Sequence, residues 1–233
     1  MDGEKINSSK LFIILPVFNE SQVICDVIDE IQKEGYKNII AIDDGSSDET
    51  FKKISSLPNV IALRHKINRG KGAATKTGFE AAKMLGAKIV VTMDSDGQHN
   101  PKDIKNLTTS IINKECEVTL GTRLKNPKGM PFHKIVANKI GNAITWYLFG
   151  LWVTDSQSGF RAYSIKALGL IDIKADRYEY ESEMIREIAR NKLKYKEVEI
   201  EVRYTDYSMG KVQKQGFING LKTLYKIIWN IIS

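Results

Sequence analysis

One acidic cluster stands out as a group of residues whose types and spacing suit metal chemistry. The segment Asp94-Ser95-Asp96-Gly97-Gln98 places two carboxylates and an amide within five residues. Carboxylate and amide oxygens are hard ligands of the kind that Mg²⁺ and Mn²⁺ prefer. Asp96 and Gln98 lie two residues apart, so an extended chain points both side chains to one side. The sequence therefore predicts an oxygen-rich site for Mg²⁺ or Mn²⁺ that can reach a diphosphate. We expect the following His99 to lie at the surface or behind the ligands.

A second acidic cluster, Asp43-Asp44-Gly45-Ser46-Ser47-Asp48, begins with two adjacent carboxylates. Such neighbours repel each other, and a fold keeps both only where donors or cations satisfy them. We expect Asp44 to face a ribose or a base. Asp48 is expected to be the N-cap of the helix that follows.

Two further segments suit nucleotide binding. Phe18, in the segment from Pro16 to Glu20, offers a ring face on which a base could stack. The alternative for this segment is a strand exit followed by an acid at a helix start. The segment 68–72, Asn-Arg-Gly-Lys-Gly, opens an Ala-rich helix, where backbone amides and Lys71 suit an anion. Its spacing matches neither the P-loop nor the dinucleotide-binding glycine pattern.

Strands and helices alternate through the first part of the chain and position these segments. Short apolar runs predict strands and helical periodicity predicts helices. The predicted strands are 11–15, 38–42, 60–63 and 89–93, and the predicted helices are 20–33, 48–57 and 73–85. This order specifies a doubly wound, mostly parallel sheet flanked by helices. Ligands of such sheets bind beyond the carboxyl ends of the strands, where the polar segments fall.

The charge of the chain is unevenly distributed. Its 233 residues carry 35 Lys and Arg against 28 Asp and Glu, with 42% hydrophobic residues and two cysteines. This composition excludes a disordered, collagen-like or disulfide-rich protein. No acid occurs in 118–154 or in 207–233, which indicates an anionic partner unless the lysines are only solvated surface residues. Basic and aromatic residues are not interleaved as in nucleic-acid-binding motifs, so no nucleic acid partner is expected.

Together, the motifs resemble glycosyltransferase family 2, the inverting enzymes of the GT-A nucleotide-sugar-binding fold. They read LPVFNE at 15–20, DDGSSDET at 43–50, NRGKGAA at 68–74 and MDSDGQHNP at 93–101. GTR at 121–123 and DSQSGFRAYS at 155–164 are similar to the branch that makes dolichyl- or polyprenyl-phosphate mannose, glucose or N-acetylhexosamine. In 204–214 the chain departs from that branch, with Tyr207 at the position of an arginine. The donor sugar therefore stays open.

The resemblance implies roles for particular residues. The donor, a nucleotide-diphosphate sugar, would contact Pro16, Phe18, Glu20, Asp43, Asp44, Lys71, Asp94 and Ser95, and the metal would bind Asp96 and Gln98. The acceptor phosphate would contact Arg123, Lys134, Asn138, Ser158, Gly159 and Arg161. The catalytic residues implied are Asp96, Asp155, Arg123 and Arg161.

The role of Asp155 depends on the acceptor. A phosphate monoester, with a second pKa of about 6, is already ionised at neutral pH and needs no strong base. Asp155 would then orient Arg161 or a sugar hydroxyl. The resemblance to the polyprenyl-phosphate branch predicts an inverting transfer of a sugar to a polyprenyl phosphate. If the acceptor is instead a sugar hydroxyl of a cell-envelope polysaccharide, Asp155 is the essential base. A third alternative is a non-enzymatic basic protein that binds nucleic acid or lipid.

Two apolar stretches suit a membrane surface. Residues 143–153 include Trp146, Tyr147 and Trp152, which favour the headgroup boundary, although a core helix would look the same. Beyond a catalytic domain of 1–210, residues 211–233 predict an amphipathic helix that lies on lipid, docks on a membrane subunit or simply packs. No apolar stretch reaches the roughly 20 residues of a membrane-spanning helix. We expect a cytoplasmic enzyme held peripherally on the cytoplasmic face of the membrane.

Overall fold

The computed structural model of the chain describes residues 10–123, 132–177, 179–203 and 207, and for 132–138 it describes the helical backbone alone. The predicted carboxy-terminal helix 211–233 lies outside these residues, so the predicted domain boundary stays a prediction. Among the described residues, no helix is both long and apolar enough to cross a membrane.

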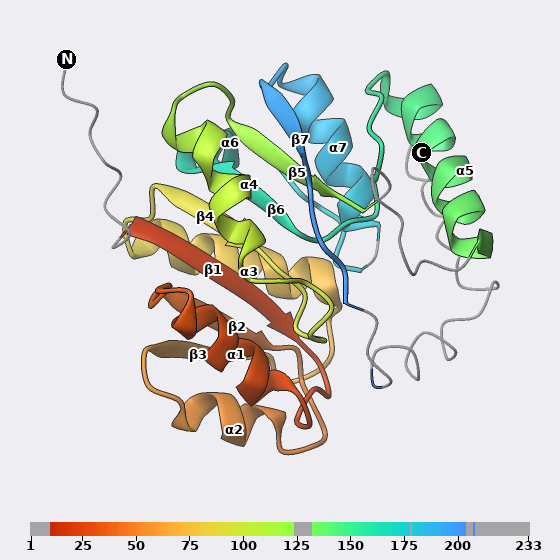
Figure 1. Cartoon of the computed structure of the whole chain (residues 1–233). Coiled ribbons are helices and arrows are strands. Elements are labelled where there is room, and N and C mark those ends of the chain that lie inside the picture. Colours follow the sequence, from red (N-terminus) through yellow and green to blue (C-terminus); the bar gives the residue numbers. More distant parts are fainter. Residues whose placement is uncertain (1–9, 124–131, 178, 204–206, 208–233) are drawn as a thin grey trace, which may run out of the picture.

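A seven-stranded sheet forms the centre of the molecule, with the strand order β3-β2-β1-β4-β6-β5-β7 (Figure 1). The strands are β1 (Leu11–Val17), β2 (Ile39–Asp43), β3 (Val60–Arg64), β4 (Ile89–Thr92), β5 (Val118–Thr122), β6 (Arg161–Ser164) and β7 (Tyr195–Glu199). Only β6 runs antiparallel to its neighbours, β4 and β5. The predicted doubly wound, mostly parallel sheet is confirmed, and its four predicted strands are β1 to β4.

Helices cover both faces of the sheet (Figure 1). They are α1 (Ile24–Lys33), α2 (Thr50–Ser56), α3 (Lys71–Met84), α4 (Asp103–Ile112), α5 (Phe132–Phe149), α6 (Ile165–Leu170) and α7 (Tyr180–Arg190). Apolar residues of α1, α2 and α4 form one buried cluster with the sheet, and those of α3, α6 and α7 form another. Helix α3 lies close to the sheet because Gly78 has no side chain. A Cβ there would lie 2.5 Å from Ile14 Cγ2.

The predicted helix starts differ from the observed ones by a few residues. Helix α1 begins at Ile24, because residues 21–23 form a turn in which the carbonyl oxygen of Glu20 accepts the N–H groups of Val23 and Ile24. Glu49, not the predicted Asp48, occupies the N-cap position of α2. Asp48 nevertheless accepts the N–H of Thr50 at 3.0 Å, so it still satisfies a donor of the first turn.

The strand order brings the polar segments to one edge. The parallel strands β1, β2, β4 and β5 all end there. Antiparallel β6 begins there, with Arg161 paired to Thr92 of β4 and to Leu120 of β5. Residues 155–160, which precede β6, therefore lie between the segments that follow β4 and β5. Neighbouring strands lie about 5 Å apart, so side chains of these segments can meet.

Candidate active site at the carboxyl edge of the sheet

An ammonium group held by two carboxylates lies at the end of β4. Lys71 Nζ, from the first residue of α3, lies 2.7 Å from Asp94 Oδ1 and 2.9 Å from Glu181 Oε1. Gly159 leaves room for this cluster, because a Cβ there would lie 2.6 Å from Asp94 Oδ1 and 2.7 Å from Lys71 Nζ. Three segments far apart in the sequence thus converge on one partly buried charge, because the side chains of Lys71 and Asp94 are 22% and 29% exposed and that of Glu181 is 5% exposed.

The cluster sets the charge states of its members. Burial alone would raise the pKa of Asp94, but the ammonium of Lys71 outweighs burial and lowers this pKa to about 2. The two carboxylates likewise overcome burial at Lys71 and raise its pKa well above the usual value. Burial raises the pKa of Glu181, whose Oε2 has no hydrogen-bond partner among the described atoms.

Asp96 and Gln98, the predicted metal ligands, lie in a tight turn. The chain turns at Gly97, which has a φ of 79°, and Asp96 Oδ1 accepts the N–H of Gln98 at 3.0 Å. The expectation of an extended chain is therefore wrong, and the turn instead presents the carboxylate of Asp96. Burial, and then the carboxylate of Asp94, raise the pKa of Asp96 to about 6. Among the described residues, no Lys or Arg forms an ion pair with it.

His99 is buried behind the segment 94–98 and contacts its backbone. It is 4% exposed, its ring stacks on Phe160 with centroids 4.8 Å apart, and Nδ1 accepts the N–H of Asp94 at 3.2 Å. Burial lowers the pKa of His99 to about 4, so the ring is neutral near pH 7. The expectation that it lies behind the predicted ligands is confirmed, and its position fixes the backbone of Asp94.

The predicted nucleotide segments meet at the ends of β1 and β4. Ser95 Oγ donates to the carbonyl oxygen of Pro16 at 2.9 Å, which joins the two segments. Phe18 is 44% exposed, so its ring is free to stack on a ligand. Glu20 is buried and accepts the hydroxyl of Tyr207 at 2.7 Å.

Asp43 and Asp44 are buried and contacted by donors or cations of the protein. Asp43 Oδ1 accepts the N–H of Ser46 at 3.2 Å, and Oδ2 lies 3.0 Å from Arg64 Nε but accepts no hydrogen bond among the described atoms. Both oxygens of Asp44 hold the loop before α3. Oδ1 lies 2.7 Å from His65 Nδ1 and accepts the N–H of Arg69, and Oδ2 accepts the N–H of Gly70 at 2.7 Å. In this structure Asp44 therefore positions the Lys71 loop, and its contact with a ribose or base stays a prediction.

Arg123, at the end of β5, is held by a buried carboxylate. Its Nε donates to Asp155 Oδ2 at 2.6 Å and its Nη2 donates to Asp155 Oδ1 at 2.8 Å, which is a bidentate pair. The Asp155 side chain is fully buried, whereas that of Arg123 is 20% exposed. The guanidinium can therefore still face a ligand, while the carboxylate cannot.

Asp155 was expected to orient Arg161 or a sugar hydroxyl, and the first of these alternatives is wrong, because Arg123 binds both of its oxygens. Arg161 makes other contacts. Its guanidinium is buried and donates to three carbonyl oxygens, those of Ser156, Ser158 and Glu181. Arg161 therefore fixes the loop 155–160 and joins it to α7. Its contact with an acceptor, like that of the buried Ser158, stays a prediction. The side chains of Lys134 and Asn138 lie outside the described residues, although both residues belong to α5, so their contact with the acceptor phosphate stays a prediction.

Residues 12–170 match the sequence profile of Glycosyl transferase family 2. The chain belongs to this family. It is 40% identical over 239 residues to a UDP-N-acetylglucosamine--dolichyl-phosphate N-acetylglucosaminyltransferase of Methanococcus voltae, with 94% of each chain covered. It is 24% identical to the polyprenol monophosphomannose synthase of Mycolicibacterium smegmatis, over 96% of this chain and 88% of that one.

The fold of this family 2 glycosyltransferase is also that of solved GT-A enzymes. Glucosyl-3-phosphoglycerate synthase from Mycobacterium tuberculosis, solved with Mn²⁺, UDP and phosphoglyceric acid, superposes with a TM-score of 0.66 at 20% identity, covering 91% of this chain and 77% of that one. The predicted GT-A fold and glycosyl transfer are therefore confirmed, and the non-enzymatic alternative is wrong.

Sequence reasoning missed one residue of this glycosyltransferase site. Glu181 belongs to a run, Glu179-Tyr180-Glu181-Ser182-Glu183, that by composition suits a solvated helix start. In the structure Glu181 is 4% exposed and contacts Lys71. The local sequence holds no signal for this contact, because it depends on α7 packing beside α3.

Proposed function

We propose that this glycosyltransferase moves N-acetylglucosamine from UDP-N-acetylglucosamine to a polyprenyl phosphate of the dolichyl type, with inversion at the anomeric carbon. The relative that is 40% identical is named for the transfer of N-acetylglucosamine from UDP-N-acetylglucosamine to dolichyl phosphate, which supports this donor and this acceptor. The relative that is 24% identical is named as a polyprenol monophosphomannose synthase, which supports a polyprenyl phosphate as the acceptor. One observation carries the proposal for the acceptor: Arg123 has an accessible guanidinium whose orientation is fixed by a buried carboxylate. A fixed guanidinium fork suits the bidentate binding of a phosphate.

The order of groups along the edge fits an in-line transfer. Asp96 lies after β4, Gly159 lies before the neighbouring β6, and Arg123 lies after β5, on the far side of β6. With the diphosphate at Asp96 and the acceptor phosphate at Arg123, the sugar would lie between them, over the cluster of Asp94 and Lys71. This order of residues supports an alignment of nucleophile, anomeric carbon and leaving group in the proposed reaction.

In the proposed reaction, an oxygen of the acceptor phosphate attacks the anomeric carbon from the face opposite the diphosphate. The new carbon–oxygen bond forms as the bond to the diphosphate breaks, and UDP leaves with the bonding electrons. The phosphate is a dianion above its second pKa of about 6, so no proton must be removed. Arg123 holds this anion in line.

A divalent metal, Mg²⁺ or Mn²⁺, fits the turn at Asp96 and Gln98. Among the described residues, no cluster of three or more His, Cys, Asp or Glu suits a metal. However, such ions bind through one or two carboxylates when substrate phosphates supply further oxygens. Asp96 offers a desolvated carboxylate without a cation partner among the described residues, and the Gln98 amide can add an oxygen. When bound, the metal would stabilise the charge of the departing diphosphate.

A sugar hydroxyl as acceptor is the weaker candidate. It would require a general base, and the predicted base is Asp155. Both oxygens of Asp155 are bound by Arg123, and its side chain is fully buried. Both oxygens are thus occupied by Arg123 donors and shielded from solvent, so neither is placed to take a proton from a substrate hydroxyl.

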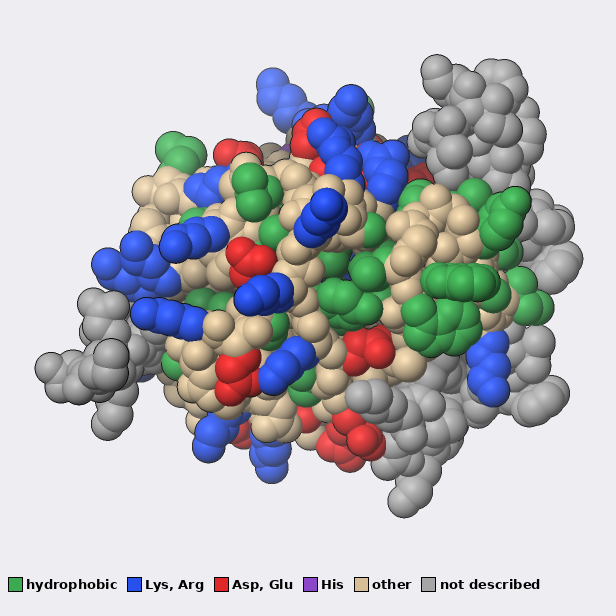
Figure 2. Space-filling model, turned by 90° about the horizontal axis from the view of Figure 1, so that it is seen from above, with side chains coloured by type: hydrophobic (Ala, Val, Ile, Leu, Met, Phe, Trp, Pro, Cys, Tyr) green, Lys and Arg blue, Asp and Glu red, His purple; other side chains and the backbone are tan. Residues whose placement is uncertain are grey.

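An exposed aromatic surface on α5 and the segment after it supports attachment to a membrane surface. Ile140, Trp146, Tyr147 and Trp152 are between 50% and 84% exposed. Figure 2 shows hydrophobic side chains gathered on the side of the molecule where α5 lies in Figure 1. Trp and Tyr favour the headgroup boundary, and a lipid acceptor must be reached there. Peripheral attachment at the cytoplasmic face follows from this proposal, whereas the membrane subunit stays a prediction.

The proposal is tested by incubating the protein with vesicles that contain polyprenyl phosphate and with radiolabelled UDP-N-acetylglucosamine, GDP-mannose or UDP-glucose. We expect label from UDP-N-acetylglucosamine in the lipid phase, and its loss when EDTA is added. Label from another donor alone would overturn the sugar assignment. No lipid label from any donor would overturn the proposed function.

A further inference from the structure

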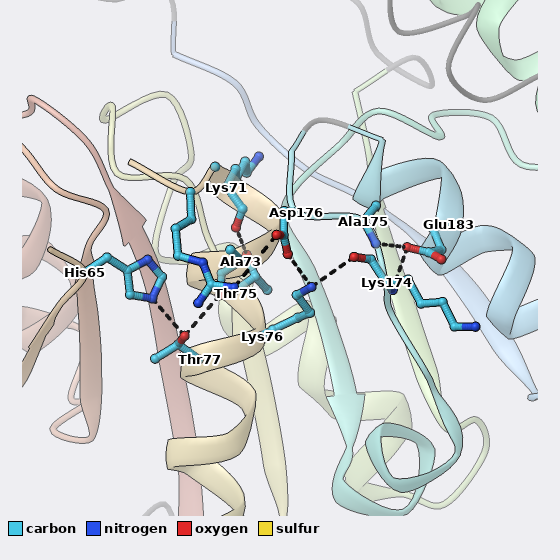
Figure 3. A network of polar contacts seen from close by, with 12 residues as sticks. His65, Lys71, Ala73, Thr75, Lys76, Thr77, Lys174, Ala175, Asp176 and Glu183 are labelled. Carbon is cyan, nitrogen blue, oxygen red and sulfur yellow. Dashed lines mark hydrogen bonds and ion pairs between the residues drawn. The ribbon is translucent and has the colours of Figure 1, made fainter. Parts of the chain in front are cut away.

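The segment 172–177, which joins α6 to α7, packs across the amino-terminal turns of α3 (Figure 3). The backbone carbonyl of Asp176 accepts the N–H of Ala73 at 2.9 Å. Its carboxylate lies 2.5 Å from Lys76 Nζ, which also donates to the carbonyl oxygen of Lys174 at 3.1 Å. Lys76 thus ties the second turn of α3 to two residues of this segment.

The same segment is also tied to the start of α7. Glu183 Oε2 accepts the N–H groups of Lys174 and Ala175 at 3.0 and 2.6 Å. Gly72 permits the close approach on the α3 side, because a Cβ there would lie 2.5 Å from the carbonyl oxygen of Ala175. The segment therefore fixes the amino-terminal turns of α3 and α7 relative to each other.

These two helix starts carry the groups that meet at the site. Lys71 is the first residue of α3, and Glu181 is the second residue of α7. The Lys71 ammonium contacts Glu181 and Asp94 at once only when the helices keep their present separation. A small shift of α3 would move Lys71 away from one of its two partners.

The pair of Lys76 and Asp176 lies largely at the surface. The two side chains are 29% and 43% exposed. Exposed ion pairs contribute little to folding stability. A displacement of about 1 Å in a group that positions substrate can nevertheless cost up to roughly 100-fold in rate. The pair thus has more influence on the site than on the fold.

We propose that Asp176 is a positioning residue of this enzyme, which acts by holding the Lys71 turn of α3 where the ammonium contacts the donor site. The inference rests on the proposed function, in which the transferred sugar lies over Asp94 and Lys71. Asp176 itself touches neither of these residues. It acts through the ion pairs of its carboxylate with Lys76 and, at 3.8 Å, with Arg69, and through the hydrogen bond that its carbonyl oxygen accepts from Ala73.

The test is a double-mutant cycle of Asp176→Asn and Lys76→Met, measured with UDP-N-acetylglucosamine and vesicles of polyprenyl phosphate. We expect each variant to lower kcat/KM by about 10-fold. The double variant should lose less than the product of the two single losses, because both substitutions remove the contact between Lys76 and Asp176. Each also removes one contact of its own, that of Asp176 with Arg69 Nη2 at 3.8 Å or that of Lys76 with the carbonyl oxygen of Lys174. The Tm and the affinity for UDP alone should equal those of the wild type. Glu80→Gln breaks an exposed pair with Lys83 on the same helix and should leave all values unchanged.

Two outcomes overturn the inference: a wild-type kcat/KM in Asp176→Asn, or additive losses in the double variant. A wild type that transfers no sugar would instead remove the proposed function. In that case crystal structures of the wild type and Asp176→Asn decide the inference, which requires Lys71 Nζ to leave its 2.9 Å contact with Glu181 in the variant alone.

Discussion

Replacing Asp155 by Asn tests the acceptor site most directly. Asp155 accepts three hydrogen bonds from Arg123, from its backbone N–H, Nε and Nη2. An Asn keeps one acceptor oxygen, and its amide N–H group faces a guanidinium that has only donors. The substitution therefore removes the bidentate pair and the negative charge while it preserves the shape of the side chain.

The loss of folding stability in Asp155→Asn follows from how deeply the ion pair is buried. Breaking a fully buried ion pair costs about 3–5 kcal/mol, and a single hydrogen bond to a charged group is worth about 1.5–3 kcal/mol. The Arg123 side chain is 20% exposed and can regain water. We therefore expect the free energy of unfolding to fall by about 2 kcal/mol, as for one charged hydrogen bond, which corresponds to a fall of roughly 4–8 °C in Tm.

Transfer should fall by about 100-fold, because Arg123 loses the orientation that holds the acceptor phosphate in line. The assay is kcat for lipid labelling by wild type, Asp155→Asn, Arg123→Ala and the double variant. If Asp155 acts only through Arg123, the double variant equals Arg123→Ala. If Asp155 were a general base, its replacement would cause a further large loss in the Arg123→Ala background, and that result would refute our reasoning.

Three other substitutions probe the metal turn, the cluster of Lys71, Asp94 and Glu181, and the exposed aromatic surface. With chelator present, Asp96→Asn should raise stability by about 2–3 kcal/mol at pH 7 while abolishing transfer. The pKa of Asp96 is raised to about 6, so the protonated carboxyl stabilises the fold at low pH and this contribution is lost as the pH rises through 6. The gain in Tm should accordingly vanish below about pH 4. Gly159→Ala should abolish transfer, because the new Cβ would lie under 3 Å from the ammonium and carboxylate beside it, whereas Gly169→Ala, with nothing within 4 Å of a new Cβ, should be active. Tyr147→Ser should weaken sedimentation with anionic vesicles, and equal binding by Tyr147→Ser and wild type would contradict the proposed membrane surface. Met84→Ser, at a similarly exposed apolar residue on α3, is its control and should bind as the wild type does.

Local patterns predicted the first half of the fold and the placement of the motifs. The apolar runs at 11–15, 38–42 and 89–93 became β1, β2 and β4, because continuous apolar runs of this length suit strands covered on both faces. The run at 60–63 became the edge strand β3, whose residues are only partly buried or exposed. The acidic motifs lie at the carboxyl edge because each begins at the end of one of these parallel strands in the sequence. The helix starts were less well predicted, since the turn at residues 21–23 depends on contacts of Glu20 that periodicity does not contain.

Residue types and short spacings are local properties, so the sequence was enough to identify the family, the first four strands and the chemical groups at the carboxyl edge. The last three strands, and which group meets which, depend on the tertiary structure. Antiparallel β6 lies between β4 and β5, so the loop before it places Asp155 against Arg123, while Arg161 is buried beneath that loop. Helix α7 brings Glu181 to Lys71 across more than a hundred residues of chain. Such pairings follow from the strand order and the packing of helices, which no local pattern encodes.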